Sequence, residues 1–474
     1  MLRGFLIALL FTPAIALADG PRLSYSDQLA AECDALIRDA IRRPYGWGWT
    51  RDAAAEPLEH PAPRVVSMDP LCTPAAGLVI LWAGEQLHDP SYRVAAEQVA
   101  RGISITQRST GRVNSNVIFS RAPLVNDERA AVVDRSATRC ALALLLALSE
   151  HPTTEPATAP SNASNESIHR SAARCTNWLF HQLTPNGFWP SAFPPDATPQ
   201  KAMRIVRLDD NDYRDSSTAL LLAMRIMPDD AISRLAANPT DSLKRIILKN
   251  DPHGPNLWNT AVTIDGTDVP KGFPHGPDVL ASRLVMQTLM AGYLLTGERS
   301  DGMALDAACT TLRQCRRSDG LFDRFLDPTA AADISRQYGE GAATTQSTFG
   351  PPPTTAPSTQ SVISAPFTTG TFGINPVIEA TDRIKTLGRD RYIAMLSSRF
   401  TLNQQLMAML CGLMDDPMTL SMPVSPDEIP AYLTANQERF AALDQPPPQD
   451  LPARVERIWL LLVRVKLEAM RAAK

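Results

Sequence analysis

Residues 141–148 read Ala-Leu-Ala-Leu-Leu-Leu-Ala-Leu, and a helix of this sequence is apolar on every side. Such a helix has no face to present to water, so other elements must surround it. The helical pattern around it extends over residues 136–149. An insert rich in Pro, Thr, Ser and Asn follows at 151–167, and a helical segment with a charged face then runs over 168–182. The stretch therefore predicts an inner helix backed by an outer one.

The same arrangement of an apolar segment followed by an amphipathic one repeats along the chain. The four pairs of segments are 73–82 with 91–107, 136–149 with 168–182, 216–227 with 242–249, and 279–295 with 303–316. Each pair ends in a polar turn that contains glycine, and we expect this glycine to cap the second helix in the left-handed conformation. Antiparallel pairs of this kind stack into a solenoid or close into a ring. The prediction is an all-α fold, an α/α toroid (incomplete α/α barrel) of repeated antiparallel helix pairs over residues 19–326.

The first 18 residues have the pattern of a secretory signal peptide. Arg3 precedes an apolar run at 5–11, and Ala16-Leu17-Ala18 has the small-residue pattern of a cleavage site. The apolar run is too short to span a membrane as a helix. We therefore expect cleavage after Ala18, a secreted or periplasmic protein, and no membrane attachment after cleavage.

The remaining third of the chain departs from the paired pattern. Residues 327–371 are rich in Pro, Thr and Ser and have no apolar period, which is typical of a flexible excursion. Helical periodicity returns in 372–474, first over 376–396 and 400–414, and the last helix is expected at 453–473. That helix carries charges of both signs beside its apolar residues, so we expect these C-terminal helices to pack on the toroid rather than on a membrane surface.

Composition excludes some classes of function. The net charge is −4 and the charges form no basic stripe, which argues against a nucleic-acid partner. The seven cysteines contain no Cys-x-x-Cys pair, so a zinc site is not expected. Disulfides between Cys140 and Cys175 and between Cys309 and Cys315 remain open, with buried unpaired thiols as the alternative.

Residues 187–215 concentrate the chemistry of the chain, because rigid aromatic residues there stand close to many charges. Trp189-Pro190 and Phe193-Pro194 are followed by aspartates interleaved with Arg207 and Arg214. The aspartates are Asp209, Asp210, Asp212 and Asp215. This pattern indicates a ligand site, with helix capping by Asp212 or Asp215 as the alternative.

The same stretch resembles the family ten pectate lyases. Gly187-Phe-Trp189-Pro190-Ser-Ala-Phe193-Pro194 is similar to the family's G-G-W-P-x-x-Y-P loop, and Asp209-Asp210-Asn211-Asp212 is similar to its N-D-D helix start. Trp258, Lys271 and Arg324-Phe325-Leu326-Asp327, the last similar to the family's R-F-x-D, follow in the family's order. The resemblance covers roughly residues 70 to 330.

The resemblance implies an α/α toroid whose cleft binds an acidic polysaccharide such as pectate and cleaves it by β-elimination. It implies calcium bridging the uronates to the four aspartates 209, 210, 212 and 215. The residues that it implies for catalysis are Lys271, Arg324 and Arg283. Those that it implies for substrate binding are Trp189, Phe193, Arg207, Arg214 and Trp258. The chain departs from the family in one segment, Val269-Pro-Lys-Gly-Phe-Pro274, where Lys271 stands in place of the family's arginine and the acid is missing.

Two further alternatives stay open on the sequence. Trp47 and Trp49 alternate with glycine, and they either form a sugar-stacking platform or close the bottom of the helical ring. The protein is either a secreted uronate-polymer lyase or a non-catalytic toroid that binds a glycan or a protein through the same cleft. A hydrolase that uses two separated carboxylates is a third class.

Overall fold

The structure is a computed structural model of the chain. It describes residues 24–52, 64–120, 135–150, 161–191, 205–228, 239–247, 256–266, 268–270, 273, 276–326, 369–415, 422–423 and 425–472. Most of these residues are helical, which confirms the expected all-α class. The predicted signal peptide and most of the excursion at 327–371 lie outside the described residues.

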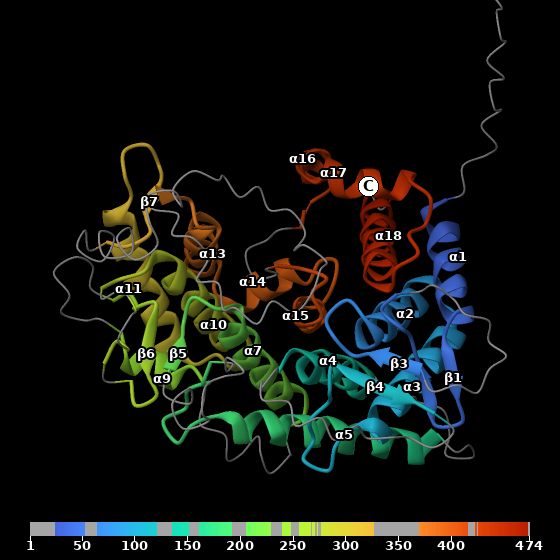
Figure 1. The fold of residues 1–474 in the computed structure, drawn as a ribbon. Helices are drawn as coiled ribbons and strands as arrows, with labels where there is room; N and C mark the ends of the chain where they lie inside the picture. The colour runs from blue at the N-terminus through green and yellow to red at the C-terminus, as the bar shows by residue number, and fades with distance from the viewer. Residues whose placement is uncertain are drawn as a thin grey trace, which may run out of the picture.

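Two layers of helices make up the first part of the described chain (Figure 1). The inner layer consists of α2 (Thr73–Leu87), α4 (Ser136–Glu150), α7 (Asn211–Ile226) and α10 (Val279–Thr296). Each inner helix contacts the next one along the chain. The segments that follow them form α3 (Pro90–Thr106), α5 (Ser161–Gln182), the short α9 (Asp241–Arg245) and α11 (Arg299–Cys315). Because α3, α5 and α11 each pack on the inner helix before them, the predicted pairing of these helices is confirmed.

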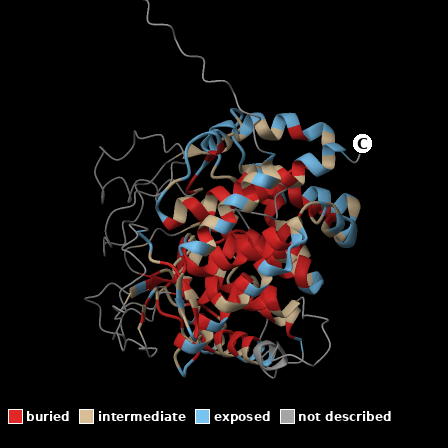
Figure 2. Ribbon diagram, turned by 90° about the vertical axis from the view of Figure 1, so that its right-hand side faces the viewer, coloured by how far each residue is buried: buried red, intermediate tan, exposed pale blue. Residues whose placement is uncertain are grey.

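Burial follows the division that the sequence pattern predicted. Ala141 to Ala143 and Leu144 to Leu146 are fully buried on α4, and α10 is buried along most of its length. Figure 2 shows buried residues gathered in the middle of the molecule and exposed residues around them. Among the described helices, α10 alone is long and apolar enough to cross a membrane, but 78% of it is buried inside the protein. That burial is the property of a core helix.

Short antiparallel strand pairs join the segments that lead into successive helices. The pairs are β1 (Ile41–Arg43) with β2 (Gly46–Gly48), β3 (Arg64–Ser67) with β4 (Asn116–Phe119), β5 (Ile205–Arg207) with β6 (Ala261–Thr263), and β7 (Phe322–Asp323) with β8 (Thr369–Gly370). The β3–β4 pair joins the segments that precede α2 and α4, and the β5–β6 pair joins those that precede α7 and α10. The β7–β8 pair joins the segment after α11 to the segment before α13. The sequence did not predict them, because two to four residues are too few to show a strand period.

The C-terminal helices contact the inner layer at several points. They are α13 (Ile374–Leu387), α14 (Arg389–Leu396), α15 (Leu402–Leu410), α16 (Ile429–Ala435), α17 (Gln437–Ala441) and α18 (Leu451–Ala472), with the 3₁₀ turns η2 (Pro426–Glu428) and η3 (Ala442–Asp444). Helix α13 packs on α10 and α11, α15 on α4 and α7, and α18 on α2 and on α1 (Tyr25–Arg38). Trp82, Phe400 and Trp459 form an aromatic cluster that joins three of these segments, with ring centroids 4.9 to 6.2 Å apart.

Three helix boundaries differ from the prediction for local reasons. Helix α7 begins at Asn211 instead of 216, because the Asp210 side chain caps it there. The single helix expected over 376–396 is two helices separated at Gly388, whose φ is +80°. Residues 242–249 were expected to be helical, but α9 ends at Arg245.

A turn of one geometry follows three of the outer helices. The turns begin at Arg108, Thr184 and Arg317, and in each the first N–H donates to the carbonyl four residues later, at 2.9 to 3.0 Å. The fourth residue is Gly111, Gly187 or Gly320, with φ of +97°, +79° and +83°. Helices α3 and α11 have already ended, with Gln107 and Arg316 as their C-caps, so the prediction that these glycines cap the helices is wrong. The glycines instead lie in the turns that lead toward α4, α7 and α13.

Hydroxyl groups near the start of three inner helices accept hydrogen bonds from backbone N–H groups about 25 residues earlier in the chain. Thr73 accepts from the N–H of Trp49 at 3.1 Å, Thr138 from that of Val113 at 3.1 Å, and Ser282 from that of Trp258 at 3.2 Å. The three acceptors all lie in the first four residues of their helices, α2, α4 and α10. The sequence repeat is therefore accompanied by a repeated hydrogen bond.

Gly111→Ala is expected to lower the free energy of unfolding by about 3 kcal/mol, because an L-residue is strained there and its Cβ meets backbone. The added Cβ would lie 2.0 Å from the carbonyl oxygen of Arg174 on α5. Gly297→Ala is the control, since Gly297 has φ of +78° but its Cβ would meet only side-chain atoms at 3.6 Å or more. The control should lose about 1 kcal/mol in urea unfolding. Equal losses in the two variants would contradict the close approach.

Candidate functional site

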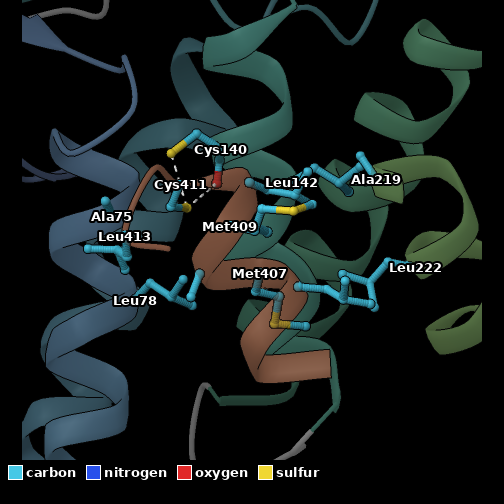
Figure 3. Close-up of a cluster of buried hydrophobic side chains, with 14 of the residues drawn as sticks. Ala75, Leu78, Cys140, Leu142, Ala219, Leu222, Met407, Met409, Cys411 and Leu413 are labelled. Carbon is cyan, nitrogen blue, oxygen red and sulfur yellow. Dashed lines mark hydrogen bonds between the residues drawn. The ribbon is translucent and has the colours of Figure 1, made fainter. Parts of the chain in front are cut away.

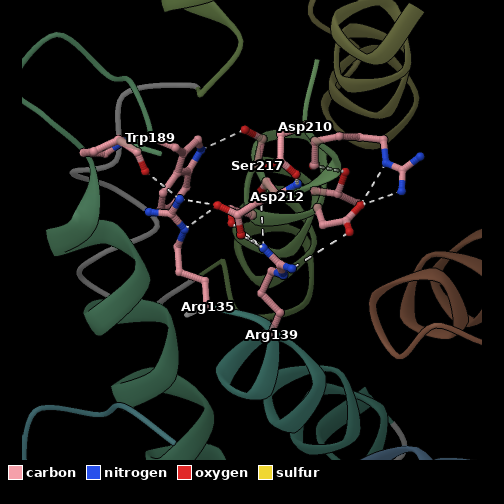
Figure 4. A network of polar contacts seen from close by, with 11 residues as sticks. Arg135, Arg139, Trp189, Asp210, Asp212 and Ser217 are labelled. Carbon is pink, nitrogen blue, oxygen red and sulfur yellow. Dashed lines mark hydrogen bonds and ion pairs between the residues drawn. The ribbon is translucent and has the colours of Figure 1, made fainter. Parts of the chain in front are cut away.

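The starts of three inner helices carry one polar network, although their sides are apolar. Arg135 and Arg139 lie at the start of α4, Asp210 and Asp212 at the start of α7, and Asp278 immediately before α10. Figure 4 shows the arginines of α4 pointing toward the first turn of α7. Charged side chains from segments 77 residues apart therefore meet at one place.

Asp212 is the centre of the first half of this network. Its carboxylate accepts from Nε of Arg135 at 3.0 Å and forms ion pairs with both Arg135 and Arg139. Both guanidinium groups are buried, whereas the Asp212 side chain keeps 23% of its surface exposed. Burial opposes ionisation of Asp212, but the two arginines outweigh it and lower its pKa to about 2. The carboxylate is therefore charged at every physiological pH.

Trp189 supports the Arg135 side of the pair. The Arg135 guanidinium carbon lies 5.5 Å from the centroid of the Trp189 ring, and its Nη2 donates to the carbonyl of Pro190 at 2.7 Å. The Trp189 indole in turn donates to the hydroxyl of Ser217 on α7 at 2.8 Å (Figure 4). The aromatic-proline step thus holds a buried arginine in position.

Arg324 joins the second half of the network, which lies between β5, β7 and α10. Its Nη2 is 3.2 Å from Oδ2 of Asp209 and 3.4 Å from Oδ2 of Asp278. Arg207 grips the same Asp209 with two nitrogens, at 3.0 and 3.1 Å. Burial raises the pKa of Asp278 even though Arg324 opposes this. Thr260 donates to Asp278 at 2.8 Å.

Arg214 extends the network along α7 toward α10. Its Nε donates to Asp215 at 2.8 Å, and its Nη1 reaches Gln287 of α10 at 3.3 Å. The guanidinium is buried, so it is a fixed cation inside the protein. Arg283, also on α10, is partly buried and lies beside the start of α13 at Gly373.

Asp210 is the part of the network that is most accessible from outside. It is exposed, and its Oδ1 accepts from the N–H of Asp212 at 3.0 Å as the cap of α7. Desolvation by the surrounding protein raises the pKa of Asp210, although the side chain still reaches solvent. The capping function expected for Asp212 or Asp215 belongs instead to Asp210, because the helix begins earlier.

Three of the predicted sugar-binding tryptophans are core residues. The exposed fractions of Trp49, Trp189 and Trp258 are 3%, 1% and 0%. The Trp49 indole donates to the carbonyl of Leu36 at 2.8 Å, and the Trp258 indole donates to that of Leu243 at 2.9 Å. The Trp189 indole donates to Ser217, as described above. No ring face is left for a sugar, so their assignment to substrate stacking is corrected to a packing role.

The remaining predicted residues fall into two groups. Trp47 lies on β2, which packs on α3 rather than beside the network, and the guanidinium of Arg42 covers its ring at 4.5 Å. Phe193 and Lys271 lie outside the described residues. The structure therefore brings Trp189, Arg207, Arg214 and Arg324 together with the four aspartates, and it does not bring Trp47 or Trp49 to them.

The aspartates, as they are arranged, do not fit a calcium ion. Calcium needs six to eight oxygen ligands, with carboxylates free to turn toward it. Asp209, Asp212 and Asp215 are each paired with one or two arginines, and Asp210 caps a helix. Within the described ranges, no three His, Cys, Asp or Glu side chains are grouped to hold a metal. Calcium would have to displace an arginine to bind here.

Arg135, Arg139 and Asp278 belong to the network but were not expected from the sequence. Two arginines four residues apart at the start of an otherwise apolar helix are a usable signal, because a charge on a buried helix needs a partner. Their partner Asp212 lies more than 70 residues away, which no local pattern reveals. Asp278 immediately before α10 is a recognisable cap, and its side chain accepts from the N–H of Leu280 at 2.8 Å.

The chain was compared with models of protein families and with curated proteins. No family model matches the chain, and no curated protein matches it. The resemblance described above therefore depends on the motifs alone.

Asp212→Asn is expected to lower the free energy of unfolding at pH 7 by about 3 kcal/mol, because it leaves two buried guanidinium groups without their anion. In the wild type, the pKa of Asp212 is about 2 in the folded state. This is below its unfolded value, so the carboxylate stabilises the fold above about pH 4 and this stability is lost as the pH falls through about 2. The variant should lack that part of the acid dependence, about 2 kcal/mol.

Asp390→Asn is the matched control, because Asp390 also pairs with an arginine but its side chain is 89% exposed. Its stability should change by less than about 0.5 kcal/mol. Urea unfolding at several pH values measures both variants. An unchanged acid dependence in Asp212→Asn would show that the buried pair is not a determinant of stability.

Proposed function

We propose that the protein is exported, to the periplasm or beyond, and binds an acidic polysaccharide such as pectate at the ends of its inner helices, where it cleaves the polymer by β-elimination. The observation that carries this proposal is the convergence of Arg135, Arg139, Arg207, Arg214 and Arg324 with the aspartates on one side of the inner layer. The order of the motifs in the sequence, similar to that of the family ten pectate lyases, supports it.

The proposed architecture is an incomplete α/α toroid. Each inner helix contacts the next, and α3, α5 and α11 back them on the outside. The repeated turns and the repeated hydroxyl contacts support a common ancestral helix pair for these units. The polar network would then lie at one mouth of the ring, where a long polymer can pass without entering the core.

Arg207 is the proposed uronate-binding residue and Asp210 the proposed catalytic base. They replace the catalytic residues that were expected from the sequence. Arg207 uses Nε and Nη2 to hold Asp209, and among the described residues its Nη1 has no hydrogen-bond partner. A uronate carboxylate accepting from Nη1 would have part of its charge neutralised. Asp210 lies three residues further on, at the exposed end of α7. Its raised pKa makes it a stronger base than an ordinary aspartate.

The proposed step is a β-elimination. Asp210 would take the proton next to the uronate carboxylate, and the electron pair of that C–H bond would form a double bond as the bond to the leaving sugar oxygen breaks. The leaving oxygen would take a proton from water. Arg324 is not assigned as the base, because it is buried between two carboxylates that hold it as a cation. No step is assigned to calcium, since the aspartates are already paired with arginines.

A second function, non-catalytic binding of the same kind of glycan, is favoured by one observation. Asp209, Asp212 and Asp215 are all neutralised internally, so the described network contains few free charges for chemistry. Glycan binding without cleavage requires only that Arg207 and Asp210 contact the polymer. The two functions share the site and differ in whether a product forms.

The assay incubates the purified protein with polygalacturonate, with calcium or with a chelator, and follows the ultraviolet absorbance of the unsaturated product. Product formation is expected, and Asp210→Asn should lower kcat by about 10²-fold or more because it removes the base. Asparagine caps helices as well as aspartate does, so the variant should fold. Asp89→Asn is its control, since Asp89 caps α3 in the same way, accepting from Ser91 at 2.8 Å.

Arg207→Gln should weaken binding of oligogalacturonate about tenfold in calorimetric titration, because one charge-assisted hydrogen bond is lost. Arg317→Gln is its control: Arg317 pairs with the aspartate two residues later, at 3.2 Å, and lies on an exposed turn. Binding that weakens only in Arg207→Gln, without any product, would support the second function. Neither product nor binding on any uronate polymer would contradict both.

A further inference from the structure

Two cysteines far apart in the sequence meet in the core. Cys140 lies on α4 and Cys411 caps the C-terminal end of α15, 271 residues later. Their sulfur atoms are 3.1 Å apart, and the Cys411 sulfur is 3.7 Å from the carbonyl oxygen of Cys140. Figure 3 shows the two side chains pointing toward each other between α4 and α15.

The backbone around both residues holds the sulfurs in this position. Helix α15 packs on α4 and α7, with Met407 and Met409 among the apolar side chains of the cluster in Figure 3. The carbonyl of Cys411 accepts from the N–H of Leu71 at 2.9 Å, which ties the end of α15 to the segment before α2. Both cysteines are fully buried. Their proximity therefore results from the packing of three chain segments and not from one flexible side chain.

We propose that Cys140 and Cys411 form a disulfide bond in the exported protein, linking the C-terminal helices covalently to the inner layer. In cells this formation requires the export proposed above, because the cytoplasm keeps thiols reduced. A disulfide has a sulfur–sulfur distance of about 2.05 Å, so the sulfurs need to approach by only about 1 Å from 3.1 Å.

The reaction is thiol–disulfide exchange with the disulfide of an extracytoplasmic oxidoreductase. The thiolate of one cysteine attacks a sulfur of that disulfide, and the mixed disulfide forms as the partner sulfur leaves. The thiolate of the second cysteine then attacks the sulfur of the first cysteine in the mixed disulfide. The bond to the oxidoreductase breaks, and the oxidoreductase departs with two thiols. The protein loses two hydrogen atoms in total, and the oxidoreductase gains them.

The two pairings left open by the sequence are less favourable. The sulfur of Cys175 accepts a hydrogen bond from Nε2 of Gln107 at 2.9 Å, while that of Cys140 faces Cys411. Cys309 and Cys315 lie on the single helix α11, where six residues separate them by about 9 Å along the axis. That separation is beyond the reach of a disulfide.

Burial determines when the bond should form. It raises the pKa of Cys140 well above the ordinary value of a thiol, so few thiolate anions exist in the folded, reduced protein. Oxidation should therefore be fast while α15 is still undocked and slow afterwards. Once formed, the bond closes a loop of 271 residues in the unfolded chain and should stabilise the docked C-terminal helices.

The first experiment needs no export. The full chain is purified under reducing conditions, unfolded, and refolded with oxidised and reduced glutathione and a purified disulfide oxidoreductase. Free thiols are alkylated in denaturant, and digested peptides are identified by mass spectrometry. A linked peptide that contains Cys140 and Cys411 is expected, with the other five of the seven cysteines alkylated. Alkylation of both residues in all molecules, or a link from either one to Cys72, would overturn the proposal.

The second experiment measures the effect of the bond. Cys140→Ala and Cys411→Ala should each lower the midpoint of thermal unfolding of the oxidised protein by roughly 5 °C more than that of the reduced protein. Cys175→Ala is the control, because Cys175 is equally buried but its sulfur bonds to Gln107. Its change should be the same in both redox states. An equal loss in both states for Cys140→Ala would mean that no disulfide contributes.

The third experiment separates this inference from the proposed export. The alkylation analysis is repeated on protein recovered from outside the cytoplasm of expressing cells. If the linked peptide forms in refolding and the protein stays in the cytoplasm in reduced form, the export proposal fails and the pairing stands. If the protein is exported with both thiols free, the disulfide proposal fails and the export proposal stands.

Discussion

The apolar sides of the inner helices constrain where charge can lie in this protein. A helix such as α4, buried around residues 141–148, has no lateral position for a polar group. Charged residues that serve a function must then lie at helix ends, where caps and exposed turns tolerate them. The starts of α4, α7 and α10 lie together because the helices contact one another in order and because β5 and β6 tie the entering chain. One polar network at one end is the consequence.

Within that network, ion pairing gives the individual residues different functions. Asp212 lies between two buried guanidinium groups, so it serves to neutralise them and is a weak base. Arg324 is similarly fixed between Asp209 and Asp278. The proposed ligand positions are the two at the edge of the network, Arg207 and Asp210. The network is thus nearly neutral overall, with a partly exposed Arg207 and an exposed Asp210 at its edge.

The sequence predicted the helices and their pairing because both depend on local patterns of apolar residues. It also predicted a ligand site in residues 187–215, where aromatic and charged residues are dense, and three of the aspartates of this stretch do lie in one network of ion pairs. It could not predict that the indoles of Trp189 and Trp258 point into the core, because a tryptophan in a loop has the same local sequence whether exposed or buried. The pairing of Asp212 with Arg135 depends on long-range packing, and so does the meeting of Cys140 with Cys411.

Hydrogen–deuterium exchange of the protein with and without oligogalacturonate would locate the proposed binding site along the chain. Slower exchange with the ligand is expected in residues 205–212, which contain β5 and the start of α7, with little change in the core of α4 or in α18. Backbone amides at the exposed start of α7 are the ones that a bound polymer would cover. Protection confined to α1 and α18, or no protection at saturating ligand, would contradict the assignment of the site.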